Sequence, residues 1–257
     1  MLDELAKKRK DDPLTYGKVC LTIDAMAIRK QISFDSSHKR MIGFVDLGDG
    51  PAEDTVASEA LVFMVVGLRG HWKTPIGYFF TNTLKPDTQK VLLEHALNAL
   101  HERGIEVVCL TMDGHASNIS MATMLGCQLK LQQPLKTFFN HPSSCKPVYV
   151  LFDACHMLKL VRNMFQAYGS FKSPSGAVNW HYLKALSSLQ EKEGLHAANK
   201  LSSKHIHFQN QKMKVSLAAQ TLSSSVALAL TMLHDAGLDD FKDCLPTVEF
   251  IQVLQFK

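Results

Sequence analysis

Two aspartates, Asp24 and Asp113, are the residues of this sequence best placed to do chemistry. Asp24 follows the apolar run 19–23, and Asp113 follows the apolar run 107–112. A carboxylate at the end of a strand-forming apolar run is costly unless it is paired, hydrogen-bonded or bound to a metal. Two of them in one α/β pattern favour a divalent-metal site, and such sites catalyse phosphoryl transfer on nucleic acids.

Mg²⁺ fits this pair of carboxylates. In a β-β-β-α-β unit the first strand lies centrally and the fourth pairs beside it, so Asp24 and Asp113 would meet at the crevice where open α/β sheets bind ligands. Close carboxylates repel each other unless a cation lies between them, and Mg²⁺ takes one or two carboxylates while keeping waters and phosphate oxygens. The competing interpretation is that each aspartate only caps the following turn, and the spacing leaves both open.

Asp153 is a third acidic residue at the end of a strand-like run, and a helical segment follows it. One face of that segment carries His156, Lys159, Arg162 and Asn163. Such a face at the start of a helix can bind phosphates. A solvated helix face with Asp153 as its N-cap explains the same pattern without any ligand.

Two further motifs are interpreted as turns. The run Asp46-Leu47-Gly48-Asp49-Gly50 is similar to the phosphate loop of sugar kinases and actin-like ATPases, but Pro51 replaces the threonine of that loop. His115 lies close enough in sequence to Asp113 to reach a metal or a phosphate, although a lone histidine is more often a turn residue. Ser117 or Asn118 is expected to cap the next helix.

The elements that must position these residues alternate between strand and helix patterns. Strands are predicted at 18–28, 41–47 and 59–68, with 75–80 as an antiparallel continuation of the third. A helix is predicted from Asp87, its expected N-cap, to Arg103, and Gly104 ends it. A strand at 105–112, a helix at 117–125 closed by Gly126 and a strand at 147–152 complete the order β-β-β-α-β-α-β.

The pattern after the fifth strand is mainly helical. Helices are predicted at 155–167, at 179–200 with a break at Gly194, and at 215–236, and no strand is predicted among them. The fold class is therefore α/β with a mixed sheet, followed by a mainly α-helical domain. We place the domains at 14–165 and 166–257.

Composition limits the classes of protein to consider. The 257 residues are 46% hydrophobic with a net charge of +4, which allows a substantial core and permits a nucleic-acid partner without indicating one. The six cysteines form no Cys-x-x-Cys pair, which favours free thiols in a reducing compartment over a zinc site. The sequence has no apolar run of roughly 18 residues, the length that a membrane-spanning helix needs, so no membrane span is predicted. The basic run 7–10 is compatible with nuclear targeting.

Four blocks of sequence, in order, resemble the P element transposase family, which includes the THAP-domain transposases and their domesticated animal relatives. The blocks are LTIDAM at 21–26, TMDGHASN at 111–118, FDACHMLKLVRN at 152–163 and LAAQTLSSSVA at 217–227. The resemblance covers nearly the whole chain and implies an RNase H-like catalytic domain interrupted by a helical GTP-binding insertion.

The resemblance also implies catalytic residues. The family holds two Mg²⁺ ions with two aspartates and a glutamate, and by motif Asp24 matches the first aspartate and Asp113 the second. The glutamate lies on a helix after the insertion, so it is expected beyond Lys257, and Glu249 does not match its context. The implied reaction is two-metal phosphoryl transfer on DNA, in the nucleus, with transposon ends, target DNA and GTP as partners; homo-oligomerisation is left open.

Two functions follow from these observations. The chain is expected to be a fragment of a P element-like DNA transposase, whose complete form cleaves and transfers DNA strands with Mg²⁺. The alternative is a domesticated or degenerate, non-catalytic derivative that binds DNA or nucleotide. Both matched acids are intact, which favours the first function. The third acid and the family's amino-terminal zinc-coordinating domain are not found in this sequence, which leaves the second open.

Overall fold

The structure is a computed structural model that describes residues 1–48, 50, 53–130, 134–194, 197–198 and 200–255. These residues form two compact units, 1–153 and 154–257, which are described separately. Asp49 and Pro51, which belong to the loop motif noted in the sequence, lie outside the described residues.

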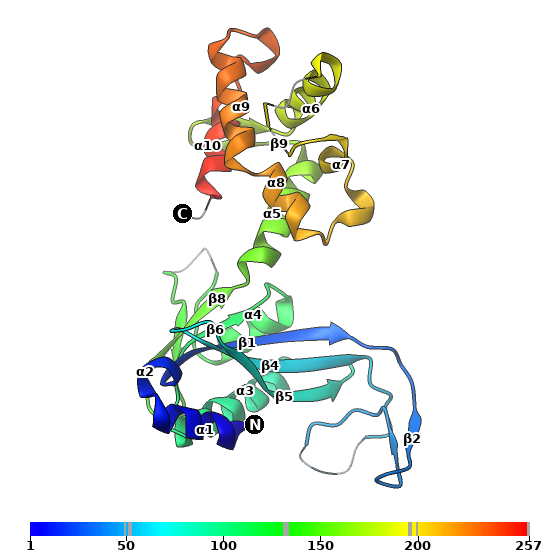
Figure 1. The fold of residues 1–257 in the computed structure, drawn as a ribbon, viewed down its shortest axis with the longest axis vertical. Coiled ribbons are helices and arrows are strands. Elements are labelled where there is room, and N and C mark those ends of the chain that lie inside the picture. The colour runs from blue at the N-terminus through cyan, green and yellow to red at the C-terminus, as the bar shows by residue number, and fades with distance from the viewer. Residues whose placement is uncertain (49, 51–52, 131–133, 195–196, 199, 256–257) are drawn as a thin grey trace. The chain divides into compact units, whose positions relative to one another are not determined.

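The first unit is built on a six-stranded mixed sheet (Figure 1). Its strand order is β5-β4-β1-β6-β8-β7. β1 pairs antiparallel with β4 and parallel with β6, and β6 pairs parallel with β8, so the predicted central place of the first strand is confirmed. The strands are β1 Lys18–Ala27, β4 Glu59–Gly67, β5 Lys73–Thr81, β6 Glu106–Met112, β7 Phe138–Asn140 and β8 Pro147–Phe152.

Helices pack on the sheet through one apolar face. The helices of this unit are α1 Leu2–Asp11, α2 Pro13–Tyr16, α3 Pro86–Glu102 and α4 Ala116–Met124. In α3, Leu93, Leu97 and Leu100 are spaced to fall on one side, and all three are fully buried in a core with Leu21 and Leu110 of the sheet. Gly104 follows α3 in a left-handed conformation with φ +72°, as predicted for the residue that ends this helix.

The predictions for the start of α3 and for residues 41–47 are wrong. Asp87 is not the N-cap of α3; Lys85 takes that place because Pro86 occupies the start of the helix. Residues 41–47 do not form a strand of the sheet. β3 Arg40–Ile42 pairs instead with β2 Ser33–Asp35 in a separate hairpin.

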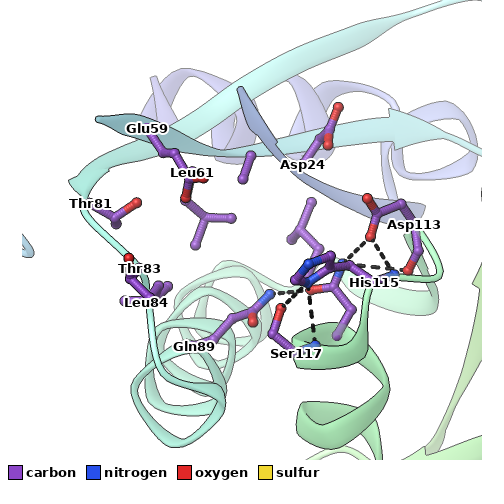
Figure 2. Close-up of a pocket in the computed structure, with 13 residues that line it drawn as sticks. Asp24, Glu59, Leu61, Thr81, Thr83, Leu84, Gln89, Asp113, His115 and Ser117 are labelled. Carbon is purple, nitrogen blue, oxygen red and sulfur yellow. Dashed lines mark hydrogen bonds between the residues drawn. The ribbon is translucent and has the colours of Figure 1, made fainter. Parts of the chain in front are cut away.

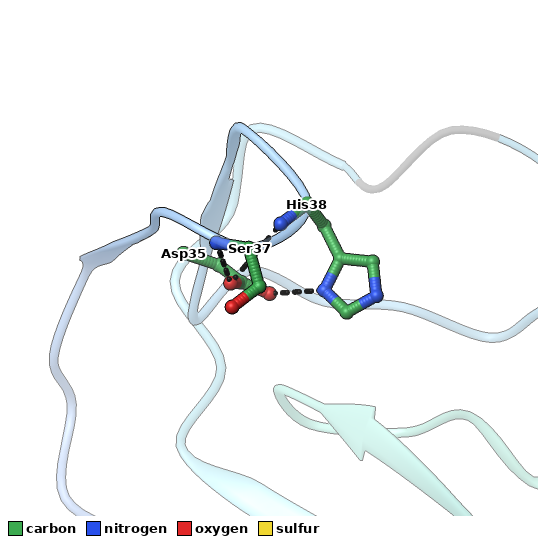
Figure 3. A network of polar contacts seen from close by, with 3 residues as sticks. All are labelled: Asp35, Ser37 and His38. Atoms are coloured by element: carbon green, nitrogen blue, oxygen red, sulfur yellow. Dashed lines mark hydrogen bonds and ion pairs between the residues drawn. The ribbon is translucent and has the colours of Figure 1, made fainter.

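The turn of this hairpin is held by Asp35. Its carboxylate accepts hydrogen bonds from the backbone N–H of Ser37 at 2.9 Å and from the His38 ring at 2.7 Å (Figure 3). Gly43 then breaks the predicted strand with φ +108°, and a Cβ there would lie 2.1 Å from the carbonyl oxygen of Gln31. The chain therefore needs glycine at the point where it leaves the hairpin.

The second unit is mainly helical, with a core centred on Phe165. The Phe165 ring packs edge-on against Phe171, Trp180 and Phe250 at centroid distances of 5.1–5.6 Å. The elements are α5 Ala154–Tyr168, β9 Ser170–Ser173, β10 Gly176–Asn179, α6 His181–Glu193, α7 Ser203–Ile206, α8 Val215–Thr221, α9 Ser224–Asp235 and α10 Leu245–Val253, with 3₁₀ turns at Gln209–Gln211 and Asp239–Phe241.

The all-helical prediction for this unit is wrong at one place. β9 and β10 form an antiparallel hairpin, and Val178 of β10 is fully buried in the helical core. Four-residue strands are too short to show a clear alternation in the sequence. α5 also belongs to this unit because it carries Phe165 into its core, whereas the predicted boundary near residue 165 places that helix in the first domain.

The helix predicted at 215–236 is two helices, α8 and α9. Ser223 lies between them in an extended conformation, with φ −93° and ψ 159°. By length and composition alone, the 21 residues Val215–Asp235 would be apolar enough to cross a membrane, which the sequence prediction overlooked. In the structure α9 buries Val226, Ala227 and Leu230 in the core of the second unit.

Candidate active site at the ends of two parallel strands

Asp24 and Asp113 line the same cavity in the first unit (Figure 2). The cavity has a volume of about 400 Å³ and lies between the sheet and the starts of α3 and α4. Its wall also contains the polar side chains of Glu59, Gln89 and His115. The structure therefore brings together the two aspartates that the sequence singled out.

The strand register explains this proximity. The parallel ladder of β1 and β6 pairs Leu21 with Leu110 and Thr22 with Thr111, so Asp24 and Asp113 follow at matching positions two residues on. Asp113 comes directly after β6, as predicted. Asp24 lies inside β1 rather than at its end, where it pairs with Val62 of β4. Asp24 is exposed, because the buried alternation of β1 stops at the residue before it.

The Asp113 carboxylate is held by hydrogen bonds from the segment that follows it. Its Oδ1 accepts from the backbone N–H of His115 at 2.9 Å and from Nδ2 of Asn118 at 2.6 Å. The Asn118 side chain in turn accepts a hydrogen bond from Nε2 of Gln89. The ordered carboxylate is thus connected to α4 through Asn118 and to α3 through Gln89.

His115 acts as the N-cap of α4, where Ser117 or Asn118 was expected. Its Nδ1 accepts from the backbone N–H of Ser117 at 3.4 Å and lies 2.9 Å from the Ser117 hydroxyl. One ring nitrogen is therefore engaged with the start of the helix, while the ring also lines the cavity. The interpretation of His115 as a turn residue agrees with this geometry.

Glu59 is a third carboxylate on the cavity wall, and the sequence analysis missed it. It begins β4 and pairs with Ala27 at the end of β1, beyond Asp24. The position of Glu59 follows from the antiparallel register of β1 and β4, which brings it past the end of the apolar run in β1. This register was the one signal that could have identified Glu59. Among the residues that the structure describes, no three His, Cys, Asp or Glu side chains come close enough together to hold a metal ion.

The donor set fits Mg²⁺ as a partial site. Two carboxylates from neighbouring strands supply the hard oxygen ligands that this ion prefers, and Mg²⁺ completes its coordination with waters and substrate phosphate. Asp113 contributes an oxygen of its own, because Oδ2 has no hydrogen bond to any described residue. Asp24 and Asp113 are thus the residues that could hold a cation, and a third protein ligand is not found within the described chain.

The helix after Asp153, α5, does not expose the whole of the basic face that the sequence predicted. Arg162 is fully buried in the second unit, so the prediction of an exposed face is wrong for this residue. Its guanidinium lies 3.7 Å from the centre of the Phe208 ring and donates to the carbonyl oxygen of Lys212 at 2.8 Å. Burial lowers the pKa of Arg162. Asp153 is not among the residues that line the Asp24–Asp113 cavity.

Known proteins resemble both units. The TNP-like RNase H N-terminal domain family matches residues 1–126, and the TNP-like GTP-binding insertion domain family matches residues 155–255. The chain is 35% identical over 254 residues to human DNA transposase THAP9, covering 97% of this chain and 28% of that protein. It is 27% identical over 248 residues to the Transposable element P transposase of Drosophila melanogaster, covering 92% of this chain and 29% of that protein.

A solved structure shares the fold. The Drosophila P element transposase strand transfer complex matches 93% of this chain with a TM-score of 0.76, at 24% identity and over 49% of that chain. The present chain spans less than a third of the length of the two curated relatives. The sheet with Asp24 and Asp113 on neighbouring strands is therefore the RNase H-like fold, and a mainly helical unit follows it.

Proposed function

The chain belongs to the P element transposase family, and on this premise we propose that its two units are the RNase H N-terminal and GTP-binding insertion domains of a DNA transposase. The observation that carries the proposal is the cavity into which β1 and β6 bring Asp24 and Asp113. Both aspartates lie in the sequence blocks that match the family. The proposed substrates of the complete protein are transposon ends and target DNA.

Asp24 and Asp113 would serve as metal ligands in this reaction. Bound Mg²⁺ would activate a water or a DNA 3′-hydroxyl and stabilise the leaving oxygen. The protein contributes carboxylates at fixed positions, with Asp113 oriented by Asn118 and the backbone N–H of His115. Neither aspartate has to carry a proton, because binding the cation requires the ionised form.

The third ligand is proposed to come from outside the described residues. This proposal is supported by the family resemblance, which implies a glutamate on a helix after the insertion domain. Glu59 lines the cavity but forms no three-residue cluster with the two aspartates, so we do not assign it this role. The second unit is proposed to bind GTP, and the complete protein to act in the nucleus. A non-catalytic derivative that binds DNA or nucleotide is the alternative.

The test is Mg²⁺-dependent DNA strand cleavage by the complete protein, with and without GTP. We expect Asp24→Ala and Asp113→Ala to lower cleavage by at least about a thousandfold, because each removes a ligand whose charge the metal site needs. Folding should be preserved, since Asp24 is exposed and Asp113 is partly exposed. Asp54→Ala, an exposed acid in a loop outside the cavity, is the matched control.

Two outcomes would count against the proposal in different ways. Cleavage at the wild-type rate in either aspartate variant would reject the metal-site assignment. Absence of cleavage in the wild-type complete protein, together with intact DNA or GTP binding, would support the non-catalytic alternative.

A further inference from the structure

The side chains of Gln89, Asn118 and Asp113 form a continuous hydrogen-bonded chain from α3 to the end of β6. Nε2 of Gln89 donates to Oδ1 of Asn118 at 2.5 Å, and Nδ2 of Asn118 donates to Oδ1 of Asp113 at 2.6 Å. Gln89 is 4% exposed and Asn118 is 9% exposed. The two amides are therefore nearly shielded from water, which could otherwise satisfy them in any orientation.

The direction of this chain is set by Asp113. An ionised carboxylate only accepts hydrogen bonds, whereas an asparagine amide has one donating and one accepting end. Asn118 therefore has one favourable orientation, with Nδ2 toward Asp113. Its Oδ1 then needs a donor inside the protein, and Gln89 supplies that donor.

We propose that Gln89 and Asn118 are positioning residues that fix the Asp113 carboxylate for cation binding. With Oδ1 occupied by Asn118 and the His115 N–H, the carboxylate cannot rotate freely, and Oδ2 remains for a ligand. The inference rests on the proposed function for the reaction that Asp113 serves. It extends that function to Gln89, which reaches Asp113 only through Asn118.

Gln89 allows a test that separates positioning from packing. Gln89→Glu keeps the size and shape of the side chain but places a carboxylate opposite Oδ1 of Asn118. The Asn118 amide then turns its donor toward the new carboxylate, and its oxygen faces Asp113. Gln89→Met, the matched control, removes the donor without adding an acceptor, so the Asn118 amide still prefers to donate to Asp113 but is held less firmly.

The first readout needs no metal. In the wild-type chain, nuclear magnetic resonance should show that the Asn118 side-chain Nδ2 resonance is coupled to the Asp113 carboxyl carbon across their hydrogen bond. We expect Asp113→Ala and Gln89→Glu to lose this coupling near neutral pH, and Gln89→Met to reduce it without abolishing it. On acidification Gln89→Glu should recover the coupling, because burial raises the pKa of a carboxyl and its protonated form can donate to Asn118.

The second readout is the affinity of the complete protein for Mn²⁺, used as a paramagnetic substitute for Mg²⁺. We expect Gln89→Glu to weaken binding by about tenfold, the lower range for losing a residue that orients a metal ligand, and Gln89→Met to weaken it less. Asn118→Leu should also weaken binding, and it keeps the test available if Gln89→Glu does not fold. Thermal unfolding of each variant reports the folded fraction.

The outcomes distinguish this inference from the proposed function. Equal effects of Gln89→Glu and Gln89→Met on the Asn118 resonance, or no recovery at low pH, would overturn the positioning role. If the complete wild-type protein binds no Mn²⁺ while the Asn118 resonance behaves as expected, the metal-site proposal fails and the role of Gln89 in orienting Asp113 stands.

Discussion

Both units of the protein bury polar side chains, but the contacts of these side chains lead to a cavity in one unit and stay inside the core in the other. In the first unit, Gln89 and Asn118 lead to Asp113 on the wall of a cavity. In the second unit, Arg162 is surrounded by the Phe208 ring and the Lys212 carbonyl inside a core. The contrast indicates that a buried polar group contributes to a site when its chain of contacts ends on a group that a ligand can reach.

Arg162 illustrates the opposite arrangement. No ion pair joins it to a carboxylate within the described residues, and its Nη1 is buried without a hydrogen-bond partner there. A buried charge of this kind opposes folding unless other contacts offset it. The stacking on Phe208 and the bond to Lys212 link α5 to a segment about fifty residues away, so this residue serves the core.

The strongest test of the comparison is whether the two cores unfold separately. Leu97→Ala in the first core and Phe165→Ala in the second should each destabilise their own unit by about 3–5 kcal/mol, because both side chains are fully buried. Each unit contains one of the two tryptophans, Trp72 and Trp180. Chains with Trp180→Phe or Trp72→Phe would therefore report urea unfolding of one unit at a time.

The expected pattern is selective. Phe165→Ala should lower the unfolding midpoint reported by Trp180 and leave the midpoint reported by Trp72 nearly unchanged, and Leu97→Ala should do the reverse. If either substitution moves both midpoints equally, the two cores form one cooperative unit and the comparison between them loses its basis.

A smaller effect is expected from Arg162. Arg162→Ala should cost about 3 kcal/mol in the second unit, since it leaves a cavity beside Phe208. Arg162→Met fills much of that space and removes the unpaired charge, so it should stay within about 1 kcal/mol of the wild type. Urea unfolding monitored by Trp180 measures both, with the exposed Lys184→Ala in α6 as control. A methionine variant as unstable as the alanine variant would show that the guanidinium itself stabilises this core.

The same contrast explains what the sequence could predict. The apolar runs before Asp24 and Asp113 predicted neighbouring strands, because a parallel pair aligns matching positions of two buried runs. Gln89 gave no such signal, since its contact with Asn118 depends on how α3 packs against α4. Arg162 was placed on the wrong face because helical periodicity assigns a charged residue to solvent, and its partner Phe208 lies far along the chain.

The smallest predicted effect concerns a buried histidine in the first unit. His141 is neutral with its proton on Nε2: Nδ1 accepts from the backbone N–H groups of Ser143 and Ser144, and Nε2 donates to the carbonyl oxygen of Leu97. Burial lowers its pKa below the ordinary value of 6.5. As the pH falls through 6.5, His141 binds a proton in the unfolded chain before it does so in the folded chain. The stability contributed by neutral His141 is therefore fully present above this pH, and it is lost as the pH falls toward the lower pKa of the folded state.

His141→Asn separates this titration from all others. An asparagine oxygen can accept from the Ser143 N–H, but the bond to Leu97 is lost, so stability should fall by about 1 kcal/mol at a pH well above 6.5. When the pH is lowered from well above 6.5 to a moderately acidic value, the variant should lose less stability than the wild type. Urea unfolding monitored by Trp72 measures this difference. The midpoint reported by Trp180 should be unaffected. If the variant and the wild type lose the same stability on acidification, His141 is not held neutral. The buried polar groups of the first unit would then tolerate a charge, as the second unit tolerates Arg162.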